Sequence, residues 1–307
     1  MKRFEDLKQI SVPFAPAVVT IGNFDGVHVG HQALFSQVIE KAKGLGGTSV
    51  VVTFEPHPVR VLNGIERFPL ITLYEQKVEL IAATGIDVLV VIPFSKAFAA
   101  TPARSFVQEI LWEKIGMRAV IVGPDYSFGK KREGNIALLE DMGKALGFEV
   151  IVSKWIEQDT GRISSTEIRN LVREGKVDQA SILLGRHYQV RGTVTRGRDR
   201  GGKLLGFPTA NLILYDELCP KGGVYAVTVE YDGVFFKGVA NIGYSPTFDN
   251  GEFCVEVHIL NFSDNIYGKP IRVNFIERLR GEKKFPGSEA LAAQIAKDIK
   301  KALTILS

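Results

Sequence analysis

The sequence predicts an α/β protein with two domains: a parallel sheet covered by helices, followed by a small antiparallel β-barrel that ends in a helix. Two observations lead to this fold class. Up to residue 185, apolar β-branched runs alternate with segments whose apolar residues have helical spacing, the pattern of strands joined by helices. Beyond Tyr188 the spacing alternates and glycine turns follow one another closely, the pattern of a barrel. We therefore expect domains at residues 1–185 and 186–307.

Composition narrows the class of protein. Of the 307 residues, 45% are hydrophobic and 23% are charged, as in an ordinary globular protein. The net charge of +4 is too small to indicate nucleic acid, and the longest apolar run, residues 86–94, is too short to cross a membrane. Cys219 and Cys254 are too few for a disulfide framework. Since residues 1–7 lack a signal-peptide pattern, we expect a cytoplasmic protein without nucleic-acid or membrane partners, its oligomeric state unknown.

Glycines and prolines mark the element boundaries in the first domain. The first helix ends at Gly44, the second ends at Gly85, and Pro102 begins the third. The expected strands are residues 18–21, 49–54, 86–92, 118–122 and 149–153. The expected helices are residues 30–44, 72–81, 102–115 and 135–146, one that starts near residue 164, and residues 177–184. Because such sheets bind ligands at the carboxyl ends of their strands, we expect a site at that edge.

The loop after the first strand indicates a phosphate site. Gly22, Gly26 and Gly30 permit backbone conformations and close approaches that a Cβ atom would block, and the helix that follows presents amide N–H groups to an anion. His28 and His31 stand three residues apart at the start of this helix, where both can donate to one phosphate. The loop is neither a P-loop nor a dinucleotide fingerprint. We therefore predict transfer chemistry on a phosphate.

Two other interpretations of His28 and His31 stay open at this point. A zinc site needs a third and usually a fourth ligand, and no carboxylate or cysteine cluster accompanies the pair. The second alternative is a pair of incidental surface histidines. Against it, three more unusual segments also follow strands directly: the turn that holds His57 between two prolines, the glycine-flanked loop with Asp125, and the helix start at Ser164.

The second domain has a different pattern. Its expected strands are residues 190–194, 224–230, 234–240 and 254–261, and its expected helix is residues 288–306. Asp232-Gly233 is a hairpin signal. The basic segment at 195–203 is typical either of a nucleic-acid patch or of a loop over phosphates. Thr209 and Asn211 offer oxygen ligands suited to Mg²⁺, although a plain Pro-Thr turn has the same sequence.

Four motifs carry a resemblance to a known family: GNFDGVHVGH, TFEPHP, GPDYSFG and ISSTEIR, in this order within residues 15–185. They resemble the FMN adenylyltransferase module of the bacterial bifunctional riboflavin kinase/FAD synthetases. The first and last motifs alone are typical of the wider nucleotidyltransferase superfamily, and the FEPHP turn narrows the resemblance to flavin. In the second domain GFPTAN, VEVH, YGKPIRV and LRGEKKF resemble the riboflavin kinase module. The resemblance implies a Rossmann-like nucleotidyltransferase domain followed by a kinase barrel.

The resemblance also implies roles for individual residues. The implied catalytic residues are His28, His31, Arg169 and Glu256, the last as a base. The residues implied to bind ATP and its phosphates are Gly22, Asn23, Phe24, Asp25, Gly30, Ser164, Ser165, Thr166, Gly206 and Pro208. Those implied to bind flavin are Phe54, Pro56, His57, Pro58, Asp125, Phe128, Arg278 and Arg280. The implied ligands of Mg²⁺ are Thr209 and Asn211.

Together these features predict a bifunctional enzyme with ATP as co-substrate. The second domain would phosphorylate riboflavin to FMN, and the first would adenylylate FMN to FAD, so riboflavin, FMN, FAD and ATP are the expected ligands. Two alternatives are a nucleotidyltransferase acting on another phosphate ester and a flavin- or RNA-binding regulator without catalysis. Glu256 has an alternative of its own, since a glutamate between Val255 and Val257 on a strand can be a solvated surface residue.

Overall fold

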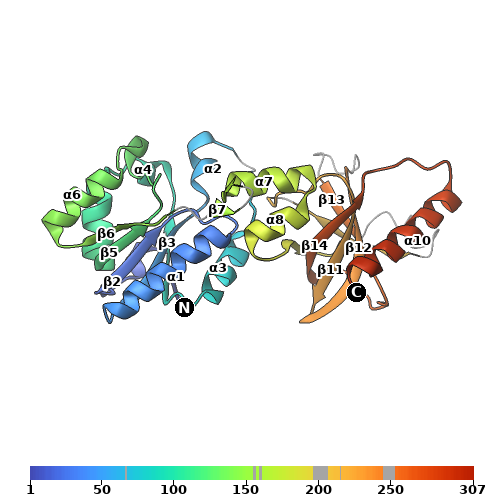
Figure 1. Cartoon of the computed structure of the whole chain (residues 1–307), viewed down its shortest axis with the longest axis horizontal. Coiled ribbons are helices and arrows are strands. Elements are labelled where there is room, and N and C mark those ends of the chain that lie inside the picture. Colours follow the sequence, from blue (N-terminus) through green and yellow to red (C-terminus); the bar gives the residue numbers. More distant parts are fainter. Residues whose placement is uncertain (66–67, 155–156, 159–160, 196–206, 215, 245–252) are drawn as a thin grey trace. The chain divides into compact units, whose positions relative to one another are not determined.

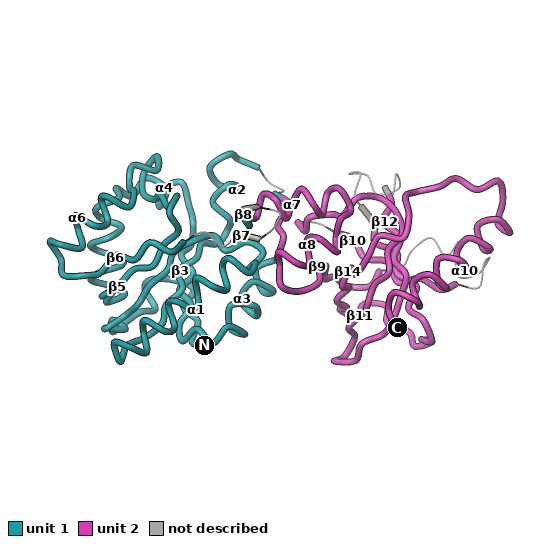
Figure 2. The backbone as a smooth tube through the Cα atoms, in the orientation of Figure 1, with its two compact units in different colours: residues 1–68, 73–164 teal, residues 69–72, 165–307 magenta. Residues whose placement is uncertain are grey.

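The computed structural model describes residues 1–65, 68–154, 157–158, 161–195, 207–214, 216–244 and 253–307. The chain divides into two compact units, which Figure 2 shows in two colours. Unit 1 comprises Met1–Phe68 and Leu73–Ser164, and unit 2 comprises Pro69–Thr72 and Ser165–Ser307. Within these described ranges, the structure contains no helix with the length and apolar character that a membrane span requires.

Unit 1 is built on a six-stranded parallel sheet, as the sequence predicts. Its strands are β1 (Lys2–Phe4), β2 (Ala17–Ile21), β3 (Thr48–Glu55), β4 (Val88–Pro93), β5 (Met117–Val122) and β6 (Glu149–Val152). All but the edge strand β1 were expected. Every residue of β2 is buried, because this strand lies inside a sheet that is covered on both faces. A ribbon of β7 (Glu157–Gln158) and β8 (Gly161–Arg162) follows the sheet.

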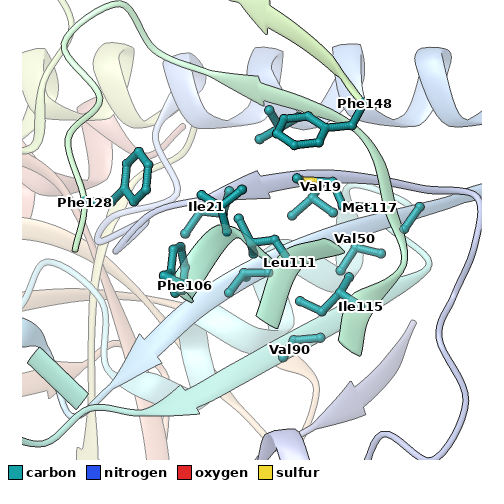
Figure 3. Close-up of a cluster of buried hydrophobic side chains, with 14 of the residues drawn as sticks. Val19, Ile21, Val50, Val90, Phe106, Leu111, Ile115, Met117, Phe128 and Phe148 are labelled. Atoms are coloured by element: carbon teal, nitrogen blue, oxygen red, sulfur yellow. The ribbon is translucent and has the colours of Figure 1, made fainter. Parts of the chain in front are cut away.

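Helices cover both faces of this sheet (Figure 1). On one face lie α1 (Val29–Gly44) and α3 (Tyr74–Ala83), whose Phe35 and Ile81 pack in a cluster of buried apolar side chains. On the other face lie the π-helix η2 (Phe106–Ile115) and α6 (Ile136–Leu146). Figure 3 shows their cluster, in which Leu111 packs beside Val19. Burial of this apolar surface is the main force that holds the layers together.

Short helical segments occupy several connections: η1 (Leu7–Gln9), α2 (Pro58–Asn63), α4 (Lys96–Ala99), α5 (Ala103–Ser105) and η3 (Lys130–Arg132). Of these, α2 replaces part of what the sequence predicted as a rigid turn. Pro58 ends the turn but also begins the helix, because the first helical position needs no N–H donor. The helix ends at Gly64, which adopts the left-handed conformation that glycine allows.

The strand order of unit 1 is β1-β4-β3-β2-β5-β6, which places β5 directly beside β2. The chain therefore builds the sheet outward from β2 to β3 and β4, and then crosses to the other side of β2 for β5 and β6. The loops that leave β2 and β5 diverge at this reversal. In open α/β sheets such a reversal forms the crevice in which ligands bind.

Unit 2 is a curled antiparallel sheet with the strand order β10-β13-β12-β11-β14-β9. The strands are β9 (Tyr188–Thr193), β10 (Ala210–Ile213), β11 (Gly223–Tyr231), β12 (Val234–Tyr244), β13 (Phe253–Ile259) and β14 (Pro270–Arg280). The edge strands β9 and β10 approach each other through a bridge between Thr195 and Asn211, which closes the sheet as the sequence predicts. Asp232 and Gly233 both have positive φ, as their two-residue hairpin turn requires.

The long strand β14 was not among the expected strands. Ile271, Val273 and Phe275 point into the core, but charged residues occupy much of the rest of the strand, so the apolar signal is weak. The expected final helix is α10 (Ser288–Ile305), and it packs on β11, β12 and β14.

Two further helices, α7 (Ser165–Glu174) and α8 (Val177–Leu184), belong to unit 2 by their contacts. The second of them packs on β9 and β14, and its Ala180 and Leu184 are fully buried. The compact units therefore divide at the start of α7. The boundary predicted between residues 185 and 186 concerns the extents of the two functions rather than the compact units. It stays a prediction.

Candidate functional sites

The loop after β2 holds its two histidines through local hydrogen bonds. His28 is the N-cap of α1, and its Nδ1 accepts a hydrogen bond from the backbone N–H of His31 at 3.3 Å. The two imidazole rings stack with their centroids 3.5 Å apart. Because Nδ1 of His28 is an acceptor, the proton of its neutral ring lies on Nε2. Both histidines lie at the start of a helix, as expected, and their role toward a phosphate stays a prediction.

The backbone of this loop is strained where it turns. Phe24 and Val27, neither of them glycine, have φ of 49° and 40°. A β-branched residue in this region is rare, and such strain is concentrated at functional sites. Two contacts secure the loop to β3: Gly22 N–H donates to the Val52 carbonyl at 3.1 Å, and Thr53 Oγ1 donates to the Asn23 carbonyl at 3.2 Å.

Close packing explains why two of the predicted positions require glycine. A Cβ atom on Gly22 would lie 2.9 Å from the ring of Phe24, and one on Gly30 would lie 3.2 Å from the ring of His28. Phe24 also packs edge-on against His31, with ring centroids 5.1 Å apart. The glycines therefore make room for the rings that order the loop. Asp25, in the same loop, is buried.

The turn after β3 holds His57 in a similar way. His57 is the N-cap of α2, and its Nδ1 accepts from the Val59 N–H at 3.2 Å. Its ring is buried and stacks on Phe68 with centroids 4.8 Å apart. Pro56 is exposed and Pro58 is half-buried, so the turn presents an apolar edge next to a fixed imidazole.

A row of aromatic side chains connects the predicted flavin residues Phe54 and Phe128. Phe54 packs on Phe98, Phe98 on Phe106, and Phe106 on Phe128, with successive centroids 6.1, 6.1 and 5.9 Å apart. Phe98 and Phe106 were not predicted as site residues, because only their contacts in the folded chain show that they belong to this row. Phe128 is buried in the core of unit 1, while Asp125 in the same loop is exposed.

The predicted ATP motif on α7 begins at the border of the two units. Ser164 is the last residue of unit 1, and Ser165 starts both α7 and the second part of unit 2. Thr166 is exposed and Arg169 is half-buried. The Nε atom of Arg169 donates to the Pro69 carbonyl at 3.3 Å, so its guanidinium is oriented by residues 69–72 within unit 2.

In the barrel, strand register brings the predicted base and a predicted metal ligand together. Glu256 lies directly opposite Asn211 on β10 and opposite Asn241 on β12. The side chain of Glu256 is exposed, but the surrounding strands partly desolvate its carboxyl group, which raises the pKa, and a hydrogen bond with Asn241 acts in the opposite direction. Asn241 was not predicted as a site residue, because only the pairing of β12 with β13 shows that it lies beside Glu256.

A cavity of about 230 Å³ opens beside Thr209. Its walls are largely apolar, with polar groups from the segment between β13 and β14. The lining residues are Val194, Pro208, Thr209, Ala210, Val257, Ile259, Phe262, Ser263, Asp264, Asn265, Ile266 and Tyr267. The size and the mixture of apolar walls with a few polar groups suit a flat heterocycle. Residues 262–267 were not predicted as site residues.

Residues 208–211, the PTAN part of the GFPTAN motif, are held by side chains of unit 2. His258 Nδ1 lies 2.8 Å from the Pro208 carbonyl, and its ring meets Phe207 edge-on. Asn211 Nδ2 donates to the Thr209 carbonyl at 3.5 Å. Its amide oxygen is the kind of atom that Mg²⁺ accepts as a ligand. The predicted ATP residue Gly206 and most of the basic segment at 195–203 lie outside the described residues.

The two predicted flavin arginines of β14 have different surroundings. Arg278 donates from its Nη2 to the Gly222 carbonyl at 2.6 Å and packs beside Tyr225. Burial raises the pKa of Tyr225 to about 12, although the guanidinium of Arg278 acts against this rise. Arg280 instead donates from Nε and Nη2 to the buried carboxylate of Asp298 at 3.0 and 2.8 Å, which attaches α10 to the sheet.

Among the described residues, no group of three or more His, Cys, Asp and Glu side chains is arranged to hold a metal ion. Thr209 and Asn211 supply a hydroxyl and an amide oxygen, and Mg²⁺ accepts such oxygens while substrate phosphates and water fill its other positions. The residues present thus fit Mg²⁺.

Two family models match the chain in succession. The family described as FAD synthetase matches residues 13–167, and the family described as riboflavin kinase matches residues 184–306. Each match covers one of the two patterns that the sequence analysis separated.

Curated relatives match along nearly the whole chain. A bifunctional riboflavin kinase/FMN adenylyltransferase from Listeria monocytogenes is 39% identical and covers 92% of this chain and 90% of its own. The protein with the same name from Bacillus subtilis is 37% identical, with 95% and 93% covered. A solved structure titled as a macrolide-efflux protein from Streptococcus pneumoniae superposes with a TM-score of 0.86 at 31% identity, covering 97% of both chains.

Proposed function

The chain belongs to the bifunctional riboflavin kinase/FMN adenylyltransferase family, and from this premise we propose which residues carry each reaction. The enzyme phosphorylates riboflavin to FMN and adenylylates FMN to FAD, with ATP as co-substrate in both steps. The FAD synthetase domain precedes the riboflavin kinase domain in the chain. We propose residues 1–185 and 186–307 as the extents of the two functions.

For the adenylyl transfer we propose that His28 and His31 donate to the reacting phosphates. The phosphate of FMN is already an anionic nucleophile, so the reaction needs no base. Its rate depends on aligning this phosphate with the α-phosphorus of ATP and on stabilising the charge that develops there. The stacking of the two imidazoles at the amino end of α1 supports this proposal, because the helix dipole there favours a phosphate. Ser165, Thr166 and Arg169 are the further residues that we propose for this reaction.

We propose that the same unit binds the flavin of FMN between the His57 turn and the loop that carries Asp125 and Phe128. The aromatic row that begins at Phe54 provides the apolar surface that an isoalloxazine ring requires. Gly22 and Gly30 keep the adjacent loop close to the rings of Phe24 and His28, and we propose that the helix start which follows this loop faces the ATP phosphates.

For the kinase reaction we propose Glu256 as the base. The nucleophile is a neutral ribityl hydroxyl, so a proton must be removed as the bond to the γ-phosphorus forms. Glu256 is held opposite Asn211 and Asn241, and the cavity beside Thr209 would take the adenine of ATP. Mg²⁺ bound by Thr209 and Asn211 would neutralise charge on the ATP phosphates.

We assign the two arginines of β14 separately. Arg278, beside Gly222 and Tyr225, is the one we propose for flavin. Arg280 is occupied by Asp298, and its contacts support the attachment of α10. We further propose that the enzyme works in the cytoplasm, since two cysteines in 307 residues suit a reducing compartment.

One observation carries the assignment of the first site: His28 caps α1 and stacks on His31 in the loop that leaves β2, where the strand order reverses. The experiment is to incubate the enzyme with riboflavin, ATP and Mg²⁺ and to separate the flavins with time. We expect FMN first and FAD afterwards. Folded protein that converts no flavin would contradict the function, and consumption of another phosphate ester with ATP would favour a different nucleotidyltransferase.

A further inference from the structure

Lys77 of α3 is a buried lysine that the reactions above do not use. Its side chain is 6% exposed. Nζ donates to the Phe54 carbonyl at 3.4 Å and lies 3.7 Å from Oε2 of Glu55. The ring of Tyr74 lies beneath the ammonium, with its centroid 5.9 Å from Nζ. Burying a lysine is costly unless its charge is compensated, so these contacts indicate that the position requires a cation.

The charges that face Lys77 come from two different loops. Desolvation lowers the pKa of Lys77, while the carboxylates of Glu55 and Asp25 act to raise it. Asp25 is 4% exposed and belongs to the loop after β2. Glu55 is the last residue of β3 and begins the turn that holds His57. Lys77 thus pairs with Glu55 of one loop and senses the charge of Asp25 in the other. The Thr53–Asn23 hydrogen bond also joins β3 to the first loop.

We propose that Lys77 is a positioning residue for adenylyl transfer, which fixes the loop of Asp25 relative to the turn of Glu55 without touching either substrate. The inference rests on the proposed function, in which the first loop binds ATP phosphates and the turn binds FMN. If the two loops set the line between the FMN phosphate and the α-phosphorus, their separation controls the rate. A displacement of about 1 Å can cost on the order of 10²-fold in rate.

A purely structural lysine would behave differently. Removing one partner of a buried ion pair leaves the other charge uncompensated, so Lys77→Met is expected to lower the melting temperature. Lys77→Met keeps most of the length of the side chain and removes its charge. A positioning role predicts that kcat of FAD formation falls in a variant whose melting curve shows it to be folded at the assay temperature. A purely structural role predicts a loss no larger than the fraction of unfolded enzyme.

The test uses the full chain in three variants: Lys77→Met, Lys77→Arg and Lys41→Met. Lys41 pairs with Glu149 at 2.6 Å, also in unit 1, but lies in the last turn of α1, so it is a matched control for the loss of a lysine–glutamate pair. For each variant, kcat and KM are measured for FAD formation from FMN and ATP, kcat is measured for riboflavin phosphorylation, and the melting temperature is recorded.

We expect Lys77→Met to lower kcat of FAD formation about 10²-fold, with KM for FMN and ATP changed less than about threefold, and to leave riboflavin phosphorylation unchanged. Lys77→Arg should recover about a tenth or more of the lost rate, and Lys41→Met should behave as the unaltered enzyme. Should Lys77→Met not fold, Glu55→Gln gives the same test, with an expected loss of about tenfold.

Normal FAD formation by folded Lys77→Met, or an equal loss of both activities, would overturn the inference. A variant with both His28→Ala and His31→Ala distinguishes a wrong role for Lys77 from a wrong proposed adenylyl site. If the histidine variant loses FAD formation while Lys77→Met retains it, only the role of Lys77 is wrong. If the histidine variant also retains it, the proposed adenylyl site itself is wrong.

Discussion

The two units build their candidate sites by different means. In unit 1 two of the three predicted histidines accept a hydrogen bond from a backbone N–H two or three residues further along the chain: His28 from His31 and His57 from Val59. In unit 2 the predicted base has its neighbours on other strands, since Glu256 lies opposite Asn211 and Asn241. The first site depends on local loop geometry, and the second depends on the register of a sheet.

This difference determines how each site can fail. A loop capped by its own side chains loses its geometry when one ring or one glycine changes, and the sheet behind it is unaffected. In a barrel, a slip of one residue would turn the whole of β13 over and move Glu256 to the other face, away from Asn211 and Asn241. Substitutions at one site should therefore leave the other reaction intact.

The largest expected effect is in unit 1. Replacing His28 and His31 together by Ala should reduce FAD formation from FMN by at least about 10³-fold, because two donors to the developing charge are lost. Riboflavin phosphorylation should stay close to normal. Both rates are measured on the same preparation by separating the flavins. Equal loss of the two activities in a folded variant would show that the sites are not separate.

The second effect is in the barrel. Glu256→Gln keeps the shape of the side chain but removes its basicity, so riboflavin phosphorylation should fall by about 10²- to 10⁴-fold. FMN supplied directly should still become FAD. Near-normal phosphorylation by this variant would show that Glu256 is not the base and is the solvated surface residue that the sequence also allowed.

The third prediction tests where the boundary between the two domains lies. A fragment of residues 186–307 should fold and phosphorylate riboflavin, and a fragment of residues 165–307 should unfold at a temperature at least about 5 °C higher. The longer fragment retains the buried face of α8, with Val177, Ala180 and Leu184. A fully buried valine or leucine side chain contributes about 1.5–3 kcal/mol. Calorimetry on both fragments checks this. Equal melting temperatures would place α8 outside the barrel's stable core.

The smallest effect lies in unit 1 away from its site. The Ser49 hydroxyl and backbone N–H donate to Oδ2 of Asp87 at 2.6 and 2.9 Å, and chiefly the hydroxyl bond lowers the pKa of Asp87. A depressed pKa stabilises the fold above the unfolded value of about 3.9, and this contribution is lost as pH falls through the folded value.

Asp87→Asn should therefore lower the melting temperature at neutral pH by at most about 4 °C, since the side chain is exposed. The difference from the unaltered enzyme should vanish as both are acidified below the folded pKa of Asp87. A difference that is the same at pH 7 and in acid would exclude the carboxylate as its cause. FAD formation at pH 7 serves as the control and should not change.

Much of unit 1 could be predicted from sequence because its signals are local. The β-branched run before Gly22 predicted β2, and the glycines with His28 and His31 predicted a loop that enters a helix. Backbone conformation at such a loop depends on a few adjacent residues, so the pattern alone is sufficient. In the barrel, the alternation that predicted β11 and β13 is local in the same sense, while β14 was missed because charged residues interrupt its apolar face.

The sequence by itself thus determined the alternation of elements, the change of pattern after residue 185 and the residue types of both sites. Tertiary structure alone decided what lies beside them. The reversal of strand order at β2, the ion pair of Lys77 with Glu55, and the pairing of Asn241 with Glu256 all join residues far apart in the chain. Which strands become neighbours is set by the burial of whole apolar faces, a property of the packed chain that no short segment contains.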